Sequence, residues 1–277
     1  MPLLTPASVR ALMAEHGLRP SRALGQNFLA DPNTARRIAR LAGVEAGDRV
    51  LEIGPGLGSL TLALLEREAH VLALELDRKL QPALEEVVAG QGDVRIVTGD
   101  ALAIDFHALL GAGPWRCVSN LPYNVATPVV VRLLEGVRSI QSALVMVQRE
   151  VADRLVARPD SAAYGAVSVK VAYYAHARIA GMVPRTVFVP APKVDSALVE
   201  LVRRDAPPVE VPSTERLFEL VRAAFAHRRK MLRRTLPAVL GDRTKSALHE
   251  AAIDPRARPE ALGLAEWAAL ARAEAAL

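Results

Sequence analysis

The sequence predicts an α/β protein in which a Rossmann-like, mostly parallel sheet is followed by a small helical domain. An apolar run ends in closely spaced glycines at Val50–Gly58, and a helical pattern follows at once, which is typical of a buried strand, a tight turn and a crossover helix. Strand-like and helical patterns then alternate as far as residue 202. Beyond a proline-rich linker at 205–212 only helical patterns remain. We therefore expect one domain over 1–206 and a helical domain over 207–277.

Composition narrows the class of protein. The 277 residues are 51% hydrophobic and 23% charged, which suits a folded core and argues against disorder. The net charge of +5 favours a polyanionic partner, although the low lysine content (five of 35 basic residues) fits a GC-rich genome equally well. A single cysteine, Cys117, excludes a disulfide framework and a thiolate metal site. No apolar run is long enough to span a bilayer and no signal-peptide pattern is present, so we expect a cytoplasmic protein without a membrane partner. We also expect a monomer that binds no metal.

Two short helices are expected at the N-terminus. The first runs over Thr5–Glu15 with Thr5 as its N-cap, and the second starts at Asp31-Pro32 with proline in its first turn and ends near Ala42. Between them Gln26-Asn27-Phe28-Leu29 is polar and irregular. Taken alone, this segment is best interpreted as a loop whose Phe28 fills the core.

The remaining elements follow from periodicity. Strands are expected at 49–54, 70–75, 93–98, 115–119 and 142–148, with a final hairpin-like pair at 178–183 and 196–202. Helices are expected near 57–67, 78–89, 126–135, 149–157 and 164–175, and in the helical domain at 214–226, 232–240, 244–252 and 264–275.

The glycine turn indicates a nucleoside ligand. Gly54 and Gly56 let the chain turn sharply and let a ligand lie against bare main chain. Glu75 ends the next strand 21 positions after Gly54, near the roughly 20 expected for a carboxylate that binds a ribose. The glycine spacing differs from that of dinucleotide enzymes, which favours a cofactor such as S-adenosylmethionine. The alternative is a turn that merely packs a helix on the sheet.

Polar residues also follow the third and fourth strands, as Asp100 and Asn120. Because ligands of parallel sheets bind at the carboxyl ends of the strands, we expect Gly54, Glu75, Asp100 and Asn120 to line one rim. Each of them alone is also a common turn or cap residue.

The segment Asn120-Leu121-Pro122-Tyr123 suits methyl transfer to an exocyclic adenine amine. The lone pair of that nitrogen is delocalised into the ring, and two acceptors on its N–H groups would localise it. The Asn120 Oδ1 atom and the Leu121 carbonyl are suitable acceptors, Tyr123 offers a face on which a flipped base stacks, and Phe188, in a proline-stiffened loop, would form the second wall. Catalysis would then consist of positioning and electrostatics.

The helical domain carries a basic run that includes Arg228, Arg229, Lys230, Arg233 and Arg234. Such a run is usually only a solvated helix face. Beside a domain that binds bases, contact with RNA phosphates is favoured.

Over nearly the whole chain, these motifs resemble the ribosomal RNA adenine N6-dimethyltransferases, particularly the bacterial small-subunit (16S) branch. The resemblance rests on Gln26–Leu29, Glu52–Gly58, Asn120–Asn124, Phe188–Ser196 and Arg228–Lys230. It implies a Rossmann-like S-adenosylmethionine-dependent methyltransferase sheet with a small C-terminal α-helical domain. It also implies dimethylation of two adjacent adenosines in the hairpin near the 3′ end of 16S rRNA, on a late 30S particle.

The resemblance further implies roles for individual residues. Cofactor contacts are expected at Asn27, Leu29, Gly54, Glu75, Asp100 and Asn120, and base handling at Asn120, Leu121, Tyr123 and Phe188.

Three alternatives remain. An erythromycin-resistance-type dimethylase of large-subunit rRNA shares the fold and cofactor, but the loop 188–196 and the helical domain argue against it. A non-catalytic rRNA-binding assembly factor is disfavoured because Asn120 and Tyr123 are present. Amino-methylases of DNA or of protein glutamine tend to have two prolines before the aromatic residue, whereas Leu121 precedes a single proline here.

Overall fold

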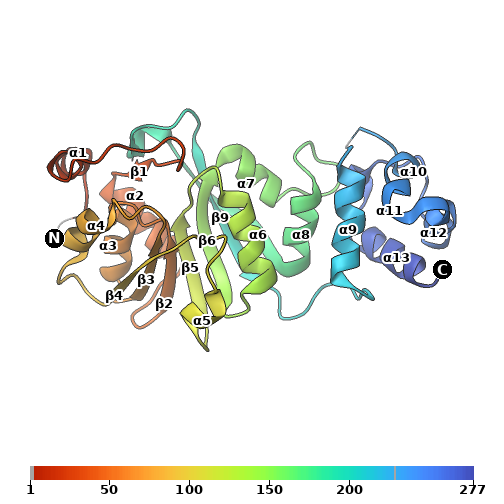
Figure 1. The fold of residues 1–277 in the computed structure, drawn as a ribbon, viewed down its shortest axis with the longest axis horizontal. Coiled ribbons are helices and arrows are strands. Elements are labelled where there is room, and N and C mark those ends of the chain that lie inside the picture. Colours follow the sequence, from red (N-terminus) through yellow and green to blue (C-terminus); the bar gives the residue numbers. More distant parts are fainter. Residues whose placement is uncertain (1–2, 228) are drawn as a thin grey trace. The chain divides into compact units, whose positions relative to one another are not determined.

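The computed structural model describes residues 3–227 and 229–277. The chain forms two compact units, the first comprising 1–152 with 177–203 and the second 153–176 with 204–277. The first contains the sheet, and the second is helical apart from the start of one strand (Figure 1).

A seven-stranded sheet organises the first unit. Its order is β4-β3-β2-β5-β6-β9-β7, and a separate two-stranded sheet joins β1 to β8. Strands β2 to β6 are parallel to their neighbours in this order, whereas β9 is antiparallel to β6. The chain winds outward from β2 through β3 to β4, then returns to the other side of β2 with β5. The topological switch point therefore lies between β2 and β5, where ligands of open α/β sheets bind.

The strands of the seven-stranded sheet agree with the expected ones to within three residues at each end. They are β2 (Arg49–Ile53), β3 (His70–Glu75), β4 (Val94–Thr98), β5 (Trp115–Asn120), β6 (Ile140–Gln148), β7 (Ala175–Val183) and β9 (Ser196–Arg203). The two-stranded sheet consists of β1 (Phe28–Leu29) and β8 (Phe188–Val189). The inner parallel strands β2, β3, β5 and β6 are mostly buried, as their apolar sequences require.

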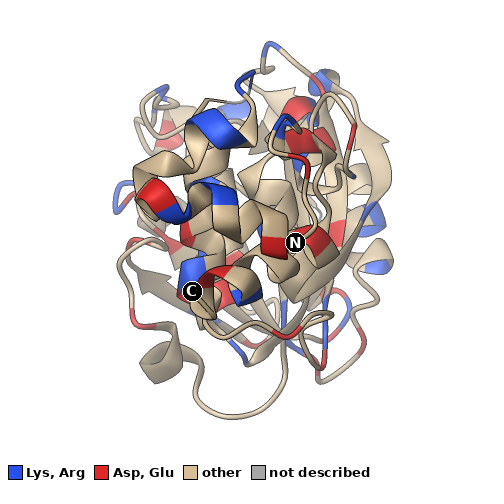
Figure 2. Cartoon of the chain, turned by 90° about the vertical axis from the view of Figure 1, so that its right-hand side faces the viewer, with Lys and Arg blue, Asp and Glu red and all other residues tan. Residues whose placement is uncertain are grey.

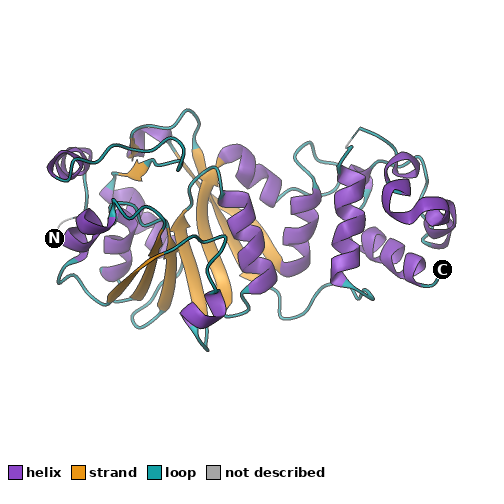
Figure 3. Ribbon diagram, in the orientation of Figure 1, coloured by secondary structure: helices purple, strands orange, loops and turns teal. Residues whose placement is uncertain are grey.

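The described helices of the first unit are α1 (Pro6–Glu15), α2 (Pro32–Leu41), α3 (Ser59–Leu65), α4 (Gln81–Val88), α5 (Phe106–Leu110), α6 (Ala126–Gly136) and α7 (Arg149–Leu155), the last of which runs into the second unit. They are seen in purple beside the strands in Figure 3, except α1, which lies apart from the seven-stranded sheet. The expected caps are confirmed: the Thr5 side chain accepts the backbone N–H of Ser8, and Asp31 caps α2 with Pro32 in its first turn.

The sequence analysis did not predict helix α5 or strands β1 and β8. Helix α5 has five residues, fewer than a periodicity argument needs, although Asp105 is its N-cap. Strands β1 and β8 have two residues each, and they pair Phe28 with Val189 and Leu29 with Phe188. This pairing brings together two segments that we interpreted as separate loops.

The second unit contains α8 (Ala166–Tyr174), α9 (Thr214–Phe225), α10 (Leu232–Thr235), α11 (Pro237–Leu240), α12 (Thr244–Glu250) and α13 (Leu264–Ala275). A single helix was expected over 232–240. It is divided into α10 and α11 because Pro237 has no N–H and its ring obstructs the preceding turn.

The compact units differ from the expected division at residue 206 in one place. The segment 153–176, which we placed with the sheet, belongs to the helical unit. The reason is its apolar face: Tyr164, Val169 and Tyr173 are buried in one cluster with Phe218 and Trp267. A polar network around Glu274 adds to this core, since Arg216 and Arg243 both donate to its carboxylate and Arg216 lowers the pKa of Glu274. Within the described residues, no helix has the length and apolar character needed to cross a membrane.

Candidate active site

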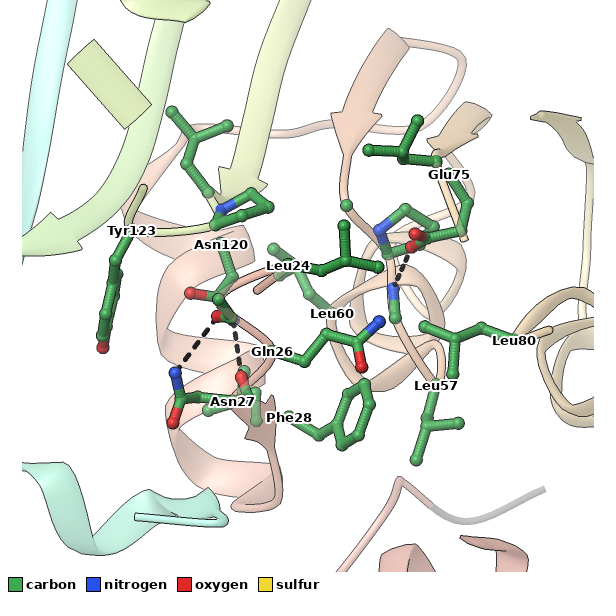
Figure 4. A pocket seen from close by; sticks show the side chains of 18 of the residues that line it. Leu24, Gln26, Asn27, Phe28, Leu57, Leu60, Glu75, Leu80, Asn120 and Tyr123 are labelled. Carbon is green, nitrogen blue, oxygen red and sulfur yellow. Dashed lines mark hydrogen bonds between the residues drawn. The ribbon is translucent and has the colours of Figure 1, made fainter. Parts of the chain in front are cut away.

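A pocket lies at the switch point of the sheet, where β2, β3 and β5 end. The pocket is open to solvent and is lined by residues of these strand ends and of the N-terminal segment. In Figure 4, Glu75 from β3 lies at one end of the pocket, and Asn120 and Tyr123 from the β5 end lie at the other. Gln26 and Leu24, from the N-terminal segment, lie between them.

The glycine turn after β2 forms the floor of the pocket. Gly54 and Gly56 have φ values of +73° and +59°, which side-chain-bearing residues rarely adopt. A Cβ on Gly54 would lie 3.3 Å from Pro122 Cδ, and one on Gly56 would lie 3.0 Å from Phe28 Cδ1. Both positions therefore need glycine for conformation and for space, and together they present bare main chain to a ligand.

Glu75 is held rigidly at the end of β3. Its Oε2 accepts the N–H of Gly56 at 3.0 Å, and its Oε1 accepts the N–H of Asp77 at 2.9 Å. Only 7% of the residue is exposed, and burial raises the pKa of Glu75, while the backbone N–H groups of Asp77 and Gly56 partly offset the rise. The carboxylate thus joins the glycine turn to β3 and keeps lone pairs free for a ligand hydroxyl.

Asn120 is the last residue of β5, where the acceptors expected for an amine are found. Its Nδ2 donates to the Asn27 carbonyl at 3.3 Å, which leaves Oδ1 available as an acceptor. The Leu121 N–H donates to Met146 O on β6 at 3.1 Å, which fixes the peptide that carries the Leu121 carbonyl. Pro122 then packs against Gly54. Asn120 and Leu121, the residues that carry the expected acceptors, therefore both line the pocket at the end of β5.

The N-terminal segment 21–27 crosses the pocket and is tied down at both ends. Gln26 Nε2 donates to Asp77 Oδ2 at 2.9 Å, beyond the end of β3. On the other side, Asn124 Nδ2 donates to the Ala23 carbonyl at 2.9 Å. These contacts hold this polar, irregular segment in place: the side-chain amides of Gln26 and Asn124 supply hydrogen bonds that a regular element would make with its own backbone.

Glu52 is an acid that the sequence argument did not single out, although it lies within the glycine motif. It is on β2, lines the pocket, is 1% exposed and accepts the Thr61 hydroxyl at 2.6 Å. Burial raises the pKa of Glu52 to about 8, the Thr61 hydrogen bond opposes this, and the Glu75 carboxylate adds to it. At neutral pH Glu52 is therefore mostly a neutral acid.

Most of the expected site residues meet in this pocket. It is lined by Asn27, Leu29, Gly54, Gly56, Glu75, Asn120, Leu121 and Tyr123. Phe28 is only 6% exposed and belongs to the apolar core, as its interpretation as a core plug requires, yet its ring also lines the pocket.

Two expected residues do not line the pocket. Phe188 is 3% exposed in the apolar core, because the pairing of β8 with β1 places it beside Leu29. The second aromatic wall expected at Phe188 is therefore absent from the pocket lining. Asp100 is exposed beyond β4, and its Oδ1 accepts the N–H of Leu102 at 2.8 Å.

Several lining residues were missed. Leu76 is one for which a signal existed, since it directly follows Glu75 and is a large apolar side chain left 50% exposed at a strand end. Pro55, Leu57 and Asn124 lie within the motifs that carried the resemblance but were given no role of their own. For the others the sequence carries no distinguishing pattern; they are Leu24, Gly25, Ser59, Leu60, Leu80 and Val125.

The expected RNA-binding run lies in the second unit, where it follows α9 and extends into α10 with Arg233 and Arg234. Arg228 is outside the described residues, whereas Arg229, Lys230, Arg233 and Arg234 are all exposed. Figure 2 shows basic and acidic residues both distributed over the helices near the C-terminus, so the basic run has acidic residues in the same part of the chain. In the described parts of both units, no group of three or more histidine, cysteine or carboxylate side chains is arranged to bind a metal ion.

Comparison with known proteins agrees with this geometry. Residues 18–274 match the family described as ribosomal RNA adenine dimethylase. A relative from Thermobifida fusca, named ribosomal RNA small subunit methyltransferase A, is 52% identical over 276 residues, which cover 97% of this chain and 95% of the relative.

Two solved structures share the fold. A dimethyladenosine transferase from Plasmodium falciparum has a TM-score of 0.75 at 23% identity, covering 88% of this chain and 95% of the other. The 23S rRNA methyltransferase ErmE has a TM-score of 0.66 at 29% identity, covering 88% of this chain and 98% of the other. With a family match that spans nearly the whole sequence and a pocket built at the switch point of a methyltransferase sheet, the chain belongs to the ribosomal RNA adenine dimethylase family of S-adenosylmethionine-dependent methyltransferases.

Proposed function

We propose that this protein transfers methyl groups from S-adenosylmethionine to N6 of two adjacent adenosines in the hairpin near the 3′ end of 16S rRNA, on a late 30S particle. One observation carries the proposal: Glu75, whose carboxylate suits the hydroxyls of a ribose, lines the same pocket as Asn120 and Leu121, whose oxygens suit the amine of an adenine. A donor bound at one end and a base inserted at the other would then meet within a single cavity. The small-subunit name of the relative that is 52% identical supports the choice of rRNA.

The pocket residues fit the cofactor. Gly54 and Gly56 leave main chain exposed where a side chain would collide, and Glu75 offers carboxylate oxygens to the ribose hydroxyls. Leu76, half exposed at the rim, offers apolar surface beside an adenine ring. When bound, the cofactor supplies an activated methyl group on a sulfonium. Asn27 and Leu29 belong to the same lining, whereas Asp100 would need its side chain to turn toward the site.

The β5 end would handle the base. Asn120 Oδ1 and the Leu121 carbonyl accept the two N–H groups of the adenine amine, which localises the nitrogen lone pair for attack. The ring of Tyr123 lines the pocket next to them and provides a stacking face. Because the methylated ammonium is strongly acidic, its proton passes to solvent without a dedicated base. The chain therefore contributes position and preorganised dipoles.

The helical unit would hold the particle. Arg229, Lys230, Arg233 and Arg234 are exposed cations in one short segment, which suits contacts with rRNA phosphates. We propose that this unit, with Arg228 in the same run, serves as the rRNA-binding domain and the sheet unit as the catalytic domain, in a monomeric cytoplasmic enzyme.

Transfer of labelled methyl groups to purified ribosomal subunits tests the proposal. The 30S subunits are taken from a strain that lacks this modification, and 50S subunits from the same strain serve as the matched substrate. We expect label in 30S subunits alone. Label confined to the 50S subunits would instead indicate methylation of large-subunit rRNA, as in the name of the 23S rRNA methyltransferase ErmE. Label in neither subunit would indicate a non-catalytic role.

A further inference from the structure

A hydrogen bond joins Tyr123, which lines the pocket, to Ser196 of strand β9, which does not. The Tyr123 Oη atom lies 2.6 Å from Ser196 Oγ, and 73 positions separate the two residues in the sequence. Tyr123 is half buried in the loop between β5 and α6, whereas Ser196 is fully buried as the first residue of β9.

Ser196 is fixed far more firmly than Tyr123. It pairs with Gln148 of β6 in the antiparallel ladder, and the adjacent Asp195 carbonyl accepts the N–H of Arg149 at 3.1 Å. Tyr123, in contrast, belongs to no helix or strand. A hydrogen bond at the tip of its ring removes the rotation about χ1 that the loop backbone alone would permit. A rigid strand therefore determines the direction in which a loop side chain presents its face.

We infer that Ser196 is a positioning residue, which acts through the Tyr123 hydroxyl to hold the aromatic ring in the orientation that stacks on the target base. The inference rests on the proposed function, since it assigns the ring to base stacking. Burial raises the pKa of the Tyr123 hydroxyl, so this group stays protonated around neutral pH and either hydroxyl can act as the donor. The two hydroxyls form one device, and neither touches the reacting atoms.

The test compares Ser196→Ala, Tyr123→Phe and the double variant in single-turnover methyl transfer to 30S subunits. Tyr123→Phe keeps the stacking ring and loses only the hydroxyl, so it is the matched partner of Ser196→Ala. Each single variant is expected to lower the apparent second-order rate about three- to tenfold, as loss of one hydrogen bond does. The double variant is expected to be no slower than either single variant, because both changes remove the same contact. Cofactor affinity, measured by calorimetry, should stay at the wild-type value in all three.

Ser168→Ala is the control for loss of a buried serine hydroxyl. Its Oγ donates to the Arg154 carbonyl in the helical unit and has no contact with Tyr123. It should lower the melting temperature and leave the methyl-transfer rate unchanged. Three results would overturn the inference: a wild-type rate for Ser196→Ala, losses that multiply in the double variant, or a loss of cofactor affinity that accounts for the rate.

A crystal structure of Ser196→Ala gives a readout that does not depend on activity. The inference predicts that the Tyr123 ring leaves its wild-type orientation or occupies more than one rotamer. A ring in the unchanged position would contradict it. If wild-type enzyme fails to methylate 30S subunits, the proposed function fails, and the ring orientation still decides whether Ser196 positions Tyr123.

Discussion

Replacing Glu52 by glutamine should make the folded protein more stable at alkaline pH, because a buried carboxyl group that must ionise is removed. Glu52 is 1% exposed, and burial raises its pKa from an ordinary 4.5 to about 8. Glutamine has nearly the same shape, and its carbonyl oxygen can still accept the hydroxyl of Thr61. The substitution therefore isolates the effect of ionising the buried acid.

The magnitude follows from proton linkage. Between pH 4.5 and 8 the folded state holds a proton at Glu52 that the unfolded state has released, so the free energy of unfolding falls as the pH rises. One pKa unit corresponds to about 1.4 kcal/mol, so a rise from 4.5 to about 8 gives a full cost on the order of 5 kcal/mol, which is approached near pH 8. The wild type and Glu52→Gln should differ in stability by less than about 1 kcal/mol at pH 5, and the variant should be more stable by several kcal/mol at pH 8.5.

Urea unfolding between pH 5 and 9 measures this difference. The chain has two tryptophans, Trp115 on β5 and Trp267 in the helical unit, so a Trp267→Phe background lets Trp115 fluorescence report on the sheet unit alone. Glu66→Gln is the matched control: Glu66 is exposed, and its ion pair with Arg36 lowers its pKa. Any stability that Glu66 contributes is lost only at pH values below its ordinary pKa, so this control should run parallel to wild type. Parallel curves for Glu52→Gln as well would refute the reasoning.

Three further predictions concern the site and the helical unit. Glu75→Ala removes the acceptor of the Gly56 N–H as well as the ribose ligand, so calorimetry should show cofactor affinity at least about tenfold weaker, and unchanged affinity would exclude Glu75 from the site. Asn120→Ala should slow single-turnover methyl transfer roughly a hundredfold at saturating substrate, because one preorganised acceptor is lost, and a near-normal rate would overturn the assigned role. Neutralising the exposed cations Lys230, Arg233 and Arg234 should weaken 30S binding and reduce its salt slope by about one unit per lost contact, with cofactor affinity as the control; an unchanged slope would make the run a solvated face.

The elements that the sequence predicted well are those with long, uniform patterns. The inner strands are buried on both faces, so each appears as a continuous apolar run, and the turn after β2 needs glycine at Gly54 and Gly56. Polar residues at strand ends were easy to group because parallel strands end at one edge. That argument grouped Glu75, Asn120 and Asp100, of which Glu75 and Asn120 line the pocket and Asp100 does not.

The parts that it did not predict depend on contacts between distant segments. The pairing of β8 with β1 joins two-residue strands, and it moves Phe188 into the core, away from the pocket lining. The assignment of α8 to the helical unit depends on a buried face that periodicity cannot attribute to either neighbour. The acidity of Glu52 depends on burial, which a local sequence does not encode.

The nucleosides formed in the reaction test the central claim most directly. Enzyme, S-adenosylmethionine and unmodified 30S subunits are incubated to completion, and the 16S rRNA is digested and analysed by mass spectrometry. The proposal predicts N6,N6-dimethyladenosine at two adjacent positions near the 3′ end, and none with heat-inactivated enzyme. Methyl groups on any other nucleoside, or 16S rRNA that stays unmodified, would contradict it.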